Sequence, residues 1–187
     1  MIFQSCGGQN ANKQSFVDHY LDVVKELKNP ERLDIAKRGS QYIIAYRKSG
    51  LIDVDNAERA KNSLLDGIKL DSISLLHVRV LKCPDPKAEE MTNDLMHGIN
   101  SVIMGDIIFA ANYSKAKDQS IQERKETIIN VKPGMKYIAE GLNSIIISMG
   151  NLQEYIQANN LKGTEDITHW YSIFKMDSDN LRGFLKR

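Results

Sequence analysis

One apolar pattern constrains the fold of this chain more than any other feature. Between positions 128 and 156, apolar residues recur at alternating spacings of three and four: Ile128, Val131, Met135, Ile138, Leu142, Ile145, Met149, Leu152 and Ile156. An α-helix places residues at this spacing on one face, whereas a strand does not. A stripe kept for about four heptads is typical of helices that pack lengthwise against other helices. The pattern therefore predicts a long helix inside an α-helical bundle.

The start of this predicted helix carries two further signals. Ser120 and Glu123 form a capping box, which would begin the helix. Pro133 follows inside the pattern but lies off the apolar stripe. We therefore expect a kink or a local break at Pro133 rather than two unrelated elements.

Capping signals divide the rest of the chain into further amphipathic segments. Asn29-Pro30 joins a favoured N-cap residue to a proline suited to the first helical position. The other predicted helix starts are Ser15, Asp53 or Asp55, Asp85-Pro86 and Gly163-Thr164, with a final turn capped again at Asp177-Ser178. We expect an all-α fold, an antiparallel helical bundle of about five to six helices with long heptad-patterned helices.

A short connection is predicted at Cys83-Pro84-Asp85-Pro86. Pro84 cannot continue a helix, and Asp85-Pro86 supplies the next helix with a cap and a first residue. So short a link favours an antiparallel hairpin. In the helix that follows, Gly98 and Gly105 share the apolar face. Because a glycine inside a helix costs about 1 kcal/mol, the two predict the close approach of another backbone.

Length and charge restrict the class of protein. The 187 residues suit one domain with its own core. We expect a flexible leader over residues 1–13 and a single helical-bundle domain over residues 14–187. The net charge is +1, and the basic residues are scattered among acidic ones, which argues against nucleic-acid binding. The sequence contains no run of about 20 apolar residues, so we expect no transmembrane helix.

Few residue patterns suggest chemistry. The sequence has no Walker loop, dinucleotide-binding fingerprint or nucleophile elbow. Two carboxylate–histidine pairs at a spacing of three, Asp94 with His97 and Asp166 with His169, resemble the metal motif of ferritin-like bundles. That family uses glutamates in its motif and adds two more that face inward, whereas no glutamate here sits clearly on an apolar stripe. We therefore expect no cofactor and keep a metal-binding protein or enzyme as an alternative.

Two apolar segments are compatible with either core packing or partner binding. Trp170, Tyr171 and Phe174 lie at helical spacing beside Ile167, which favours packing, although aromatic side chains also anchor interfaces. The nearly continuous apolar run over residues 102–111 fits central burial or an oligomer interface.

The N-terminus carries the one clue to location. Phe3-Gln4-Ser5-Cys6 resembles the cleavage box of bacterial lipoproteins, in which the cysteine is lipidated. The following residues, rich in glycine and asparagine, resemble the tether of such proteins. Phe3 stands where leucine is usual, and the charged start and apolar stretch of a signal are missing, so Met1 would be a late start. Cys6 is otherwise part of an ordinary flexible terminus. A bridge to Cys83 would require an oxidising compartment.

These observations predict a non-enzymatic helical interaction or structural protein that binds a protein partner or itself. The lipoprotein resemblance implies a lipid-anchored, extracytoplasmic envelope protein. The alternatives are the metal-binding bundle and an intracellular, cytoplasmic helical adaptor that oligomerises.

Overall fold

The computed structural model describes residues 6–48, 54–115 and 132–185. The helices are α1 (Cys6–Glu26), α2 (Pro30–Lys48), α3 (Val54–Arg79), α4 (Pro86–Lys115), α6 (Lys132–Ala158) and α7 (Thr164–Leu185). No strand occurs in these ranges. The prediction of an all-α helical bundle is therefore confirmed.

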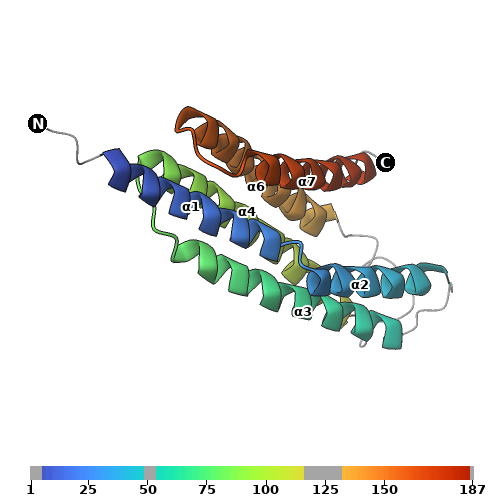
Figure 1. The fold of residues 1–187 in the computed structure, drawn as a ribbon. Helices are drawn as coiled ribbons and strands as arrows, with labels where there is room; N and C mark the ends of the chain where they lie inside the picture. The colour runs from blue at the N-terminus through green and yellow to red at the C-terminus, as the bar shows by residue number, and fades with distance from the viewer. Residues whose placement is uncertain (1–5, 49–53, 116–131, 186–187) are drawn as a thin grey trace, which may run out of the picture.

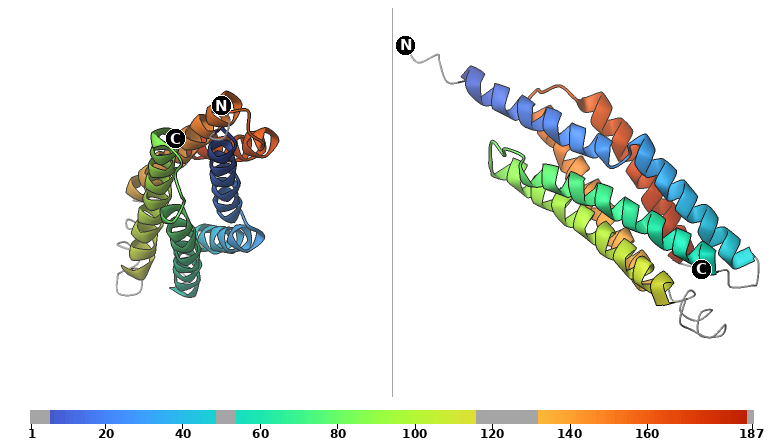
Figure 2. Two further views of the ribbon diagram at one scale, coloured as in Figure 1. Left: turned by 60° about the vertical axis from the view of Figure 1, so that its left-hand side comes forward. Right: turned by 90° about the horizontal axis from the view of Figure 1, so that it is seen from below.

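The helices run up and down the long axis of the bundle. In Figure 1, α3 and α4 lie side by side in opposite directions, α6 returns along α4, and α7 reverses again beside α6. From the end of α1, α2 leads towards the opposite end of the bundle and packs beside α3 (Figure 2). Short connections at positions 80–85 and 159–163 fit the antiparallel pairs α3–α4 and α6–α7, whereas the one at 27–29 joins α1 to α2 without a reversal (Figure 1).

Glycines set the contact between α4 and α6. A Cβ atom added to Gly98 would lie 2.8 Å from the carbonyl oxygen of Gly141, and one added to Gly105 would lie 2.7 Å from that of Gly134. The earlier glycine of α4 faces the later glycine of α6, and the later one of α4 faces the earlier one of α6. The two helices are therefore antiparallel. The predicted close approach at Gly98 and Gly105 is confirmed, and its partners are the two glycines of α6.

One heptad beyond the glycine pairs, the contact between α4 and α6 is made by polar groups. Ser148, seven residues after Gly141, is fully buried and donates a hydrogen bond to the carbonyl oxygen of Met91. The hydroxyl of Tyr20 on α1 is in turn hydrogen-bonded to Ser148 Oγ. Burial raises the pKa of Tyr20. Because buried polar groups are costly when unpaired, this chain of bonds fixes α1 against α4 and α6.

The predicted apolar stripes form much of the core. On α6, the residues at 145, 149, 152 and 156 are buried and those at 135, 138 and 142 are partly buried. They pack with Leu27 and with the buried face of α1, whose members are Phe16, Val17, Tyr20, Leu21, Val23 and Val24. Ile128 and Val131 lie outside the described residues, as does the predicted capping box at Ser120 and Glu123.

Asp85 closes the α3–α4 hairpin as predicted. Its carboxylate accepts a hydrogen bond of 3.0 Å from the backbone N–H of Ala88, which caps α4. The same carboxylate accepts a bond of 2.8 Å from the Tyr155 hydroxyl and lies 3.3 Å from Lys13 Nζ. Burial opposes ionisation, but these three partners outweigh it and lower the pKa of Asp85.

Two predicted boundaries are wrong. α1 begins at Cys6 rather than after Ser15, so helix extends into the segment expected to be a leader over residues 1–13. Once a helix is nucleated, each added residue gains a hydrogen bond at little cost. α7 runs unbroken through Asp177-Ser178, where a new cap was expected. Pro133 lies in the first turn of α6 as described, a position that tolerates proline.

We predict that Gly141→Ala lowers the free energy of unfolding by about 2–4 kcal/mol, because the new Cβ would lie 2.5 Å from the Gly98 carbonyl oxygen. Urea unfolding followed by circular dichroism measures the change. Gly67→Ala is the matched control, since a Cβ there meets nothing within 4 Å. The control should be neutral or up to about 1 kcal/mol more stable. Equal effects of the two substitutions would contradict the close approach.

A second prediction concerns acid stability. Because the folded-state pKa of Asp85 is lowered, its contribution is complete above the unfolded-state pKa of about 3.9. It is then lost as the pH falls through the folded-state value. Asp85→Asn should therefore lose about 1 kcal/mol at pH 7, and its deficit against the wild type should shrink below about pH 4. A deficit that is independent of pH would refute this account.

Candidate interaction surface

An apolar stripe lies on the outer face of α3 and continues to Val80, just after the last residue of the helix. Ile73, Leu76 and Val80 follow one another at spacings of three and four, and their exposed fractions are 48%, 56% and 75%. Residues at this spacing lie on one side of a helix. We call these three residues the α3 stripe.

The same part of α3 also faces the core. Leu75 and Val78 are buried, and Ser74 is buried beside Glu26, whose carboxylate accepts its hydrogen bond at 3.3 Å. Leu76, in contrast, is exposed. Leu75 and Leu76 are adjacent and cannot both point inward from one helix. Such apolar residues on both faces were the signal in the sequence for a second, exposed stripe.

Charged residues lie along α3 on both sides of the stripe. Glu58 and Asp66 are exposed in its N-terminal half, where Asp66 lies 3.0 Å from Lys69. Arg79 and Lys82 are exposed at its C-terminal end, next to Val80. Arg59 and Lys69 are exposed on the same stretch as Glu58 and Asp66, so charges of both signs precede the stripe and basic groups follow it.

The other apolar candidates are mainly parts of the core. Phe174 is buried, and Trp170 and Tyr171 are partly buried against the core cluster. The apolar run at 102–111 is divided between core and surface, because Met104 and Ile107 are exposed while the residues at 102 and 110 are buried. The aromatic trio therefore packs within the bundle.

The two predicted metal-binding pairs lie apart, on α4 and α7. His97 is exposed, with Nδ1 3.3 Å from Ser144 Oγ. His169 is exposed and its ring stacks edge-on against Trp170. Asp166 is 3.9 Å from Lys25 Nζ, while Asp94 is partly exposed on α4. Within residues 6–48, 54–115 and 132–185, no group of three or more His, Cys, Asp or Glu residues is placed to hold a metal ion.

The two cysteines lie in different settings. Cys6 is the first residue of α1. Cys83 is an exposed free thiol whose Sγ lies 3.4 Å from Thr92 Oγ1. The structure therefore contains no bridge at Cys83.

Comparison with known proteins does not add to this geometry. No protein-family model, curated protein or solved structure matches the chain. Among the described helices, none has the length and apolar character needed to cross a membrane. Any functional proposal therefore depends on the residues and surfaces described above.

Proposed function

We propose that this chain is a non-enzymatic helical interaction protein that pairs with a second copy of itself through the α3 stripe. The observation that carries the proposal is the exposure of Ile73 and Leu76 on the outer side of α3, and of Val80 just after it, while the other side of α3 is in the core. Three large apolar side chains held in a row by a rigid helix favour burial against another apolar surface.

The width of the stripe suits one partner helix. Residues at alternating spacings of three and four give a narrow seam, which is the pattern used between paired helices. An antiparallel arrangement centred on the stripe would place Ile73 of one copy near Val80 of the other and would bring the two Leu76 side chains together. It also aligns the helix dipoles favourably. The narrow seam and the opposed helix dipoles therefore favour a second copy in the antiparallel orientation.

The first test is the mass of the protein in solution. The wild type should sediment as a monomer–dimer mixture at micromolar concentration. Leu76→Glu should raise the dimer dissociation constant by about 10- to 100-fold, because each copy would bury a charge in place of an apolar side chain. Analytical ultracentrifugation over a range of concentrations measures both constants.

Met176→Glu is the matched control, since Met176 is a similarly exposed apolar residue, on α7. It should leave the dissociation constant unchanged, and both variants should keep the helical circular dichroism of the wild type. A wild type that stays monomeric up to about 100 μM, or a control that weakens the dimer as much as Leu76→Glu, would contradict the proposal.

We also propose that Cys6 is lipidated and anchors the protein on the extracytoplasmic side of a membrane. The lipobox-like residues before Cys6 support this, as does the position of Cys6 at the end of α1 that projects from the bundle (Figure 1). The side chains at positions 8–12 are exposed, so core packing does not oppose a nearby acyl chain.

The anchor is tested by expressing the natural coding region with its upstream sequence and measuring the mass of the mature protein. We expect a diacylglyceryl group on Cys6 and partition into detergent, both of which are lost in Cys6→Ser. Cys83→Ser should change neither. The anchor would be refuted if the mature protein keeps the residues that precede Cys6 and if Cys6 is unmodified.

A further inference from the structure

A cavity of about 280 Å³ lies between the helices, and no residue of the α3 stripe lines it. Its apolar wall is formed by Ile35 of α2, Leu64 of α3, Val102 of α4, and Ile138 and Leu142 of α6. Charged groups close another side. A volume near 300 Å³ is at the lower end of the range for small-molecule sites, and the mixture of apolar wall and few polar groups is typical of them.

Gly67 helps to keep this cavity open. It lies inside α3, where glycine costs about 1 kcal/mol relative to alanine. The paired glycines at positions 98 and 105 of α4 and 134 and 141 of α6 are explained by close backbones, but a Cβ at Gly67 would meet nothing within 4 Å. Gly67 lines the cavity. The missing side chain at this position therefore leaves open space in the cavity and is not required by a packing contact.

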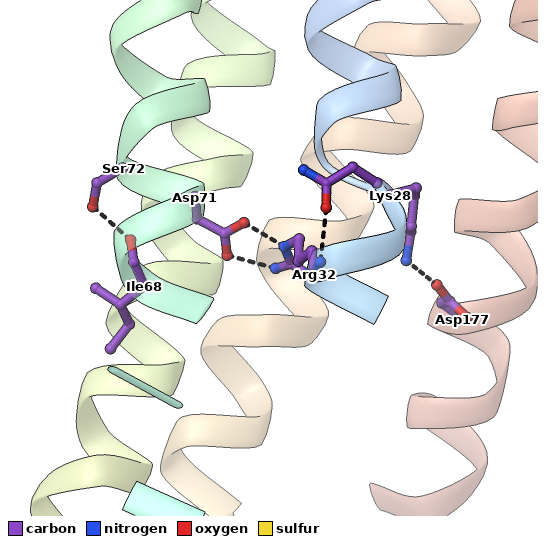
Figure 3. A network of polar contacts seen from close by, with 7 residues as sticks. Lys28, Arg32, Ile68, Asp71, Ser72 and Asp177 are labelled. Atoms are coloured by element: carbon purple, nitrogen blue, oxygen red, sulfur yellow. Dashed lines mark hydrogen bonds and ion pairs between the residues drawn. The ribbon is translucent and has the colours of Figure 1, made fainter. Parts of the chain in front are cut away.

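Two ion pairs border the cavity. The Arg32 guanidinium donates two hydrogen bonds to the carboxylate of Asp71, which is 1% exposed. Lys28 Nζ pairs with the Asp177 carboxylate. Figure 3 shows that Arg32 points towards α3 while Lys28 points towards α7, so each cation already has its own partner.

Asp106 is the third carboxyl group of this site. It lies on α4 and lines the cavity with Arg32, Lys28 and Asp177. Within the described part of the chain, no hydrogen bond or ion pair joins its carboxylate. Burial and the charge of Asp71 raise the pKa of Asp106 to about 7, although Arg32 opposes the shift. Two cations thus face three carboxyl groups, and Asp106 is the one without a counter-ion.

The geometry points to a binding site for a small amphipathic amine, whose ammonium group pairs with Asp106 and whose hydrocarbon part fills the space beside Gly67. An ammonium ion supplies the missing positive charge. A carboxylate or phosphate would instead meet cations that are already paired and would add to the negative charge. This inference is independent of the proposed self-association, because the cavity and the α3 stripe share no residue.

Binding of an amine should also release protons. An alkylamine stays protonated near neutral pH, since its pKa is close to that of lysine at about 10.4. Pairing with the amine favours the ionised form of Asp106. Because the pKa of free Asp106 is about 7, binding at pH 7 should release about half a proton per amine. The charged groups that face Asp106 are Arg32, Asp71, Lys28 and Asp177, and each of them is already ion-paired.

The test is a titration with hexylamine, followed by the backbone NMR signals of Gly67 and Asp106. Hexanol and hexanoate serve as the uncharged and negatively charged controls. Hexylamine should bind about tenfold more tightly than hexanol at pH 8, and hexanoate should bind least. Calorimetry in buffers of different ionisation enthalpy should detect the released proton at pH 7.

Two variants separate charge from space. Asp106→Asn should bind hexylamine no better than hexanol and should release no proton. Gly67→Leu should bind neither compound, because its side chain fills the cavity, while its free energy of unfolding stays at or above that of the wild type. Asp34→Asn changes an exposed aspartate of α2 and should alter nothing.

Three results would overturn the inference. The first is equal affinity for hexylamine and hexanol, and the second is undiminished amine binding in Asp106→Asn. The third is no change in the NMR signals with any of the three compounds up to about 10 mM.

Discussion

The close approach of α4 and α6 determines how the rest of the structure is arranged. At Gly98–Gly141 and Gly105–Gly134, each backbone occupies the space that a Cβ of the other helix would need. Such a contact permits one register only, because a shift by one residue would bring side chains against the neighbouring backbone. The register then aligns Ser148 with Met91, and through Ser148 it positions Tyr20 of α1.

The same contact positions the cavity. Asp106 directly follows Gly105, and Ile138, which lines the cavity, has its Cγ1 2.5 Å from where a Cβ of Gly105 would lie. The α4–α6 glycine contact therefore sets both the carboxyl group and part of the apolar wall. The bundle is tightly packed around Tyr20 and Ser148, whereas space remains where α2, α3, α4 and α6 meet around Gly67.

Local patterns predicted the elements well because their causes are local. Asn29 caps α2 through a 2.7 Å bond from the Arg32 backbone N–H, and Asp85 caps α4 in the same manner. The periodic stripe of α6 predicted its buried face where the helix is described. The glycine spacing on α4 predicted a close backbone without naming its partner, because the spacing of one helix does not identify which other helix it meets.

The exposed stripe and the charged site depend on contacts between distant segments. Leu76 and Leu75 are alike as residues, and only the placement of α3 in the bundle decides which one is buried. Arg32 and Asp71 lie 39 residues apart on different helices, so no spacing in the sequence connects them. Asp106 reads as an isolated acid within an apolar run until α2 and α3 are placed beside it.

The most direct test of this account is the proximity of the paired glycines in solution. Nuclear Overhauser effects between the Hα protons of Gly98 and Gly141, and between those of Gly105 and Gly134, would establish the backbone contact and its antiparallel register. We predict that both pairs give strong cross-peaks. If they are missing while contacts within each helix are observed, or if Gly98 is instead close to Gly134, the proposed arrangement of the bundle is wrong.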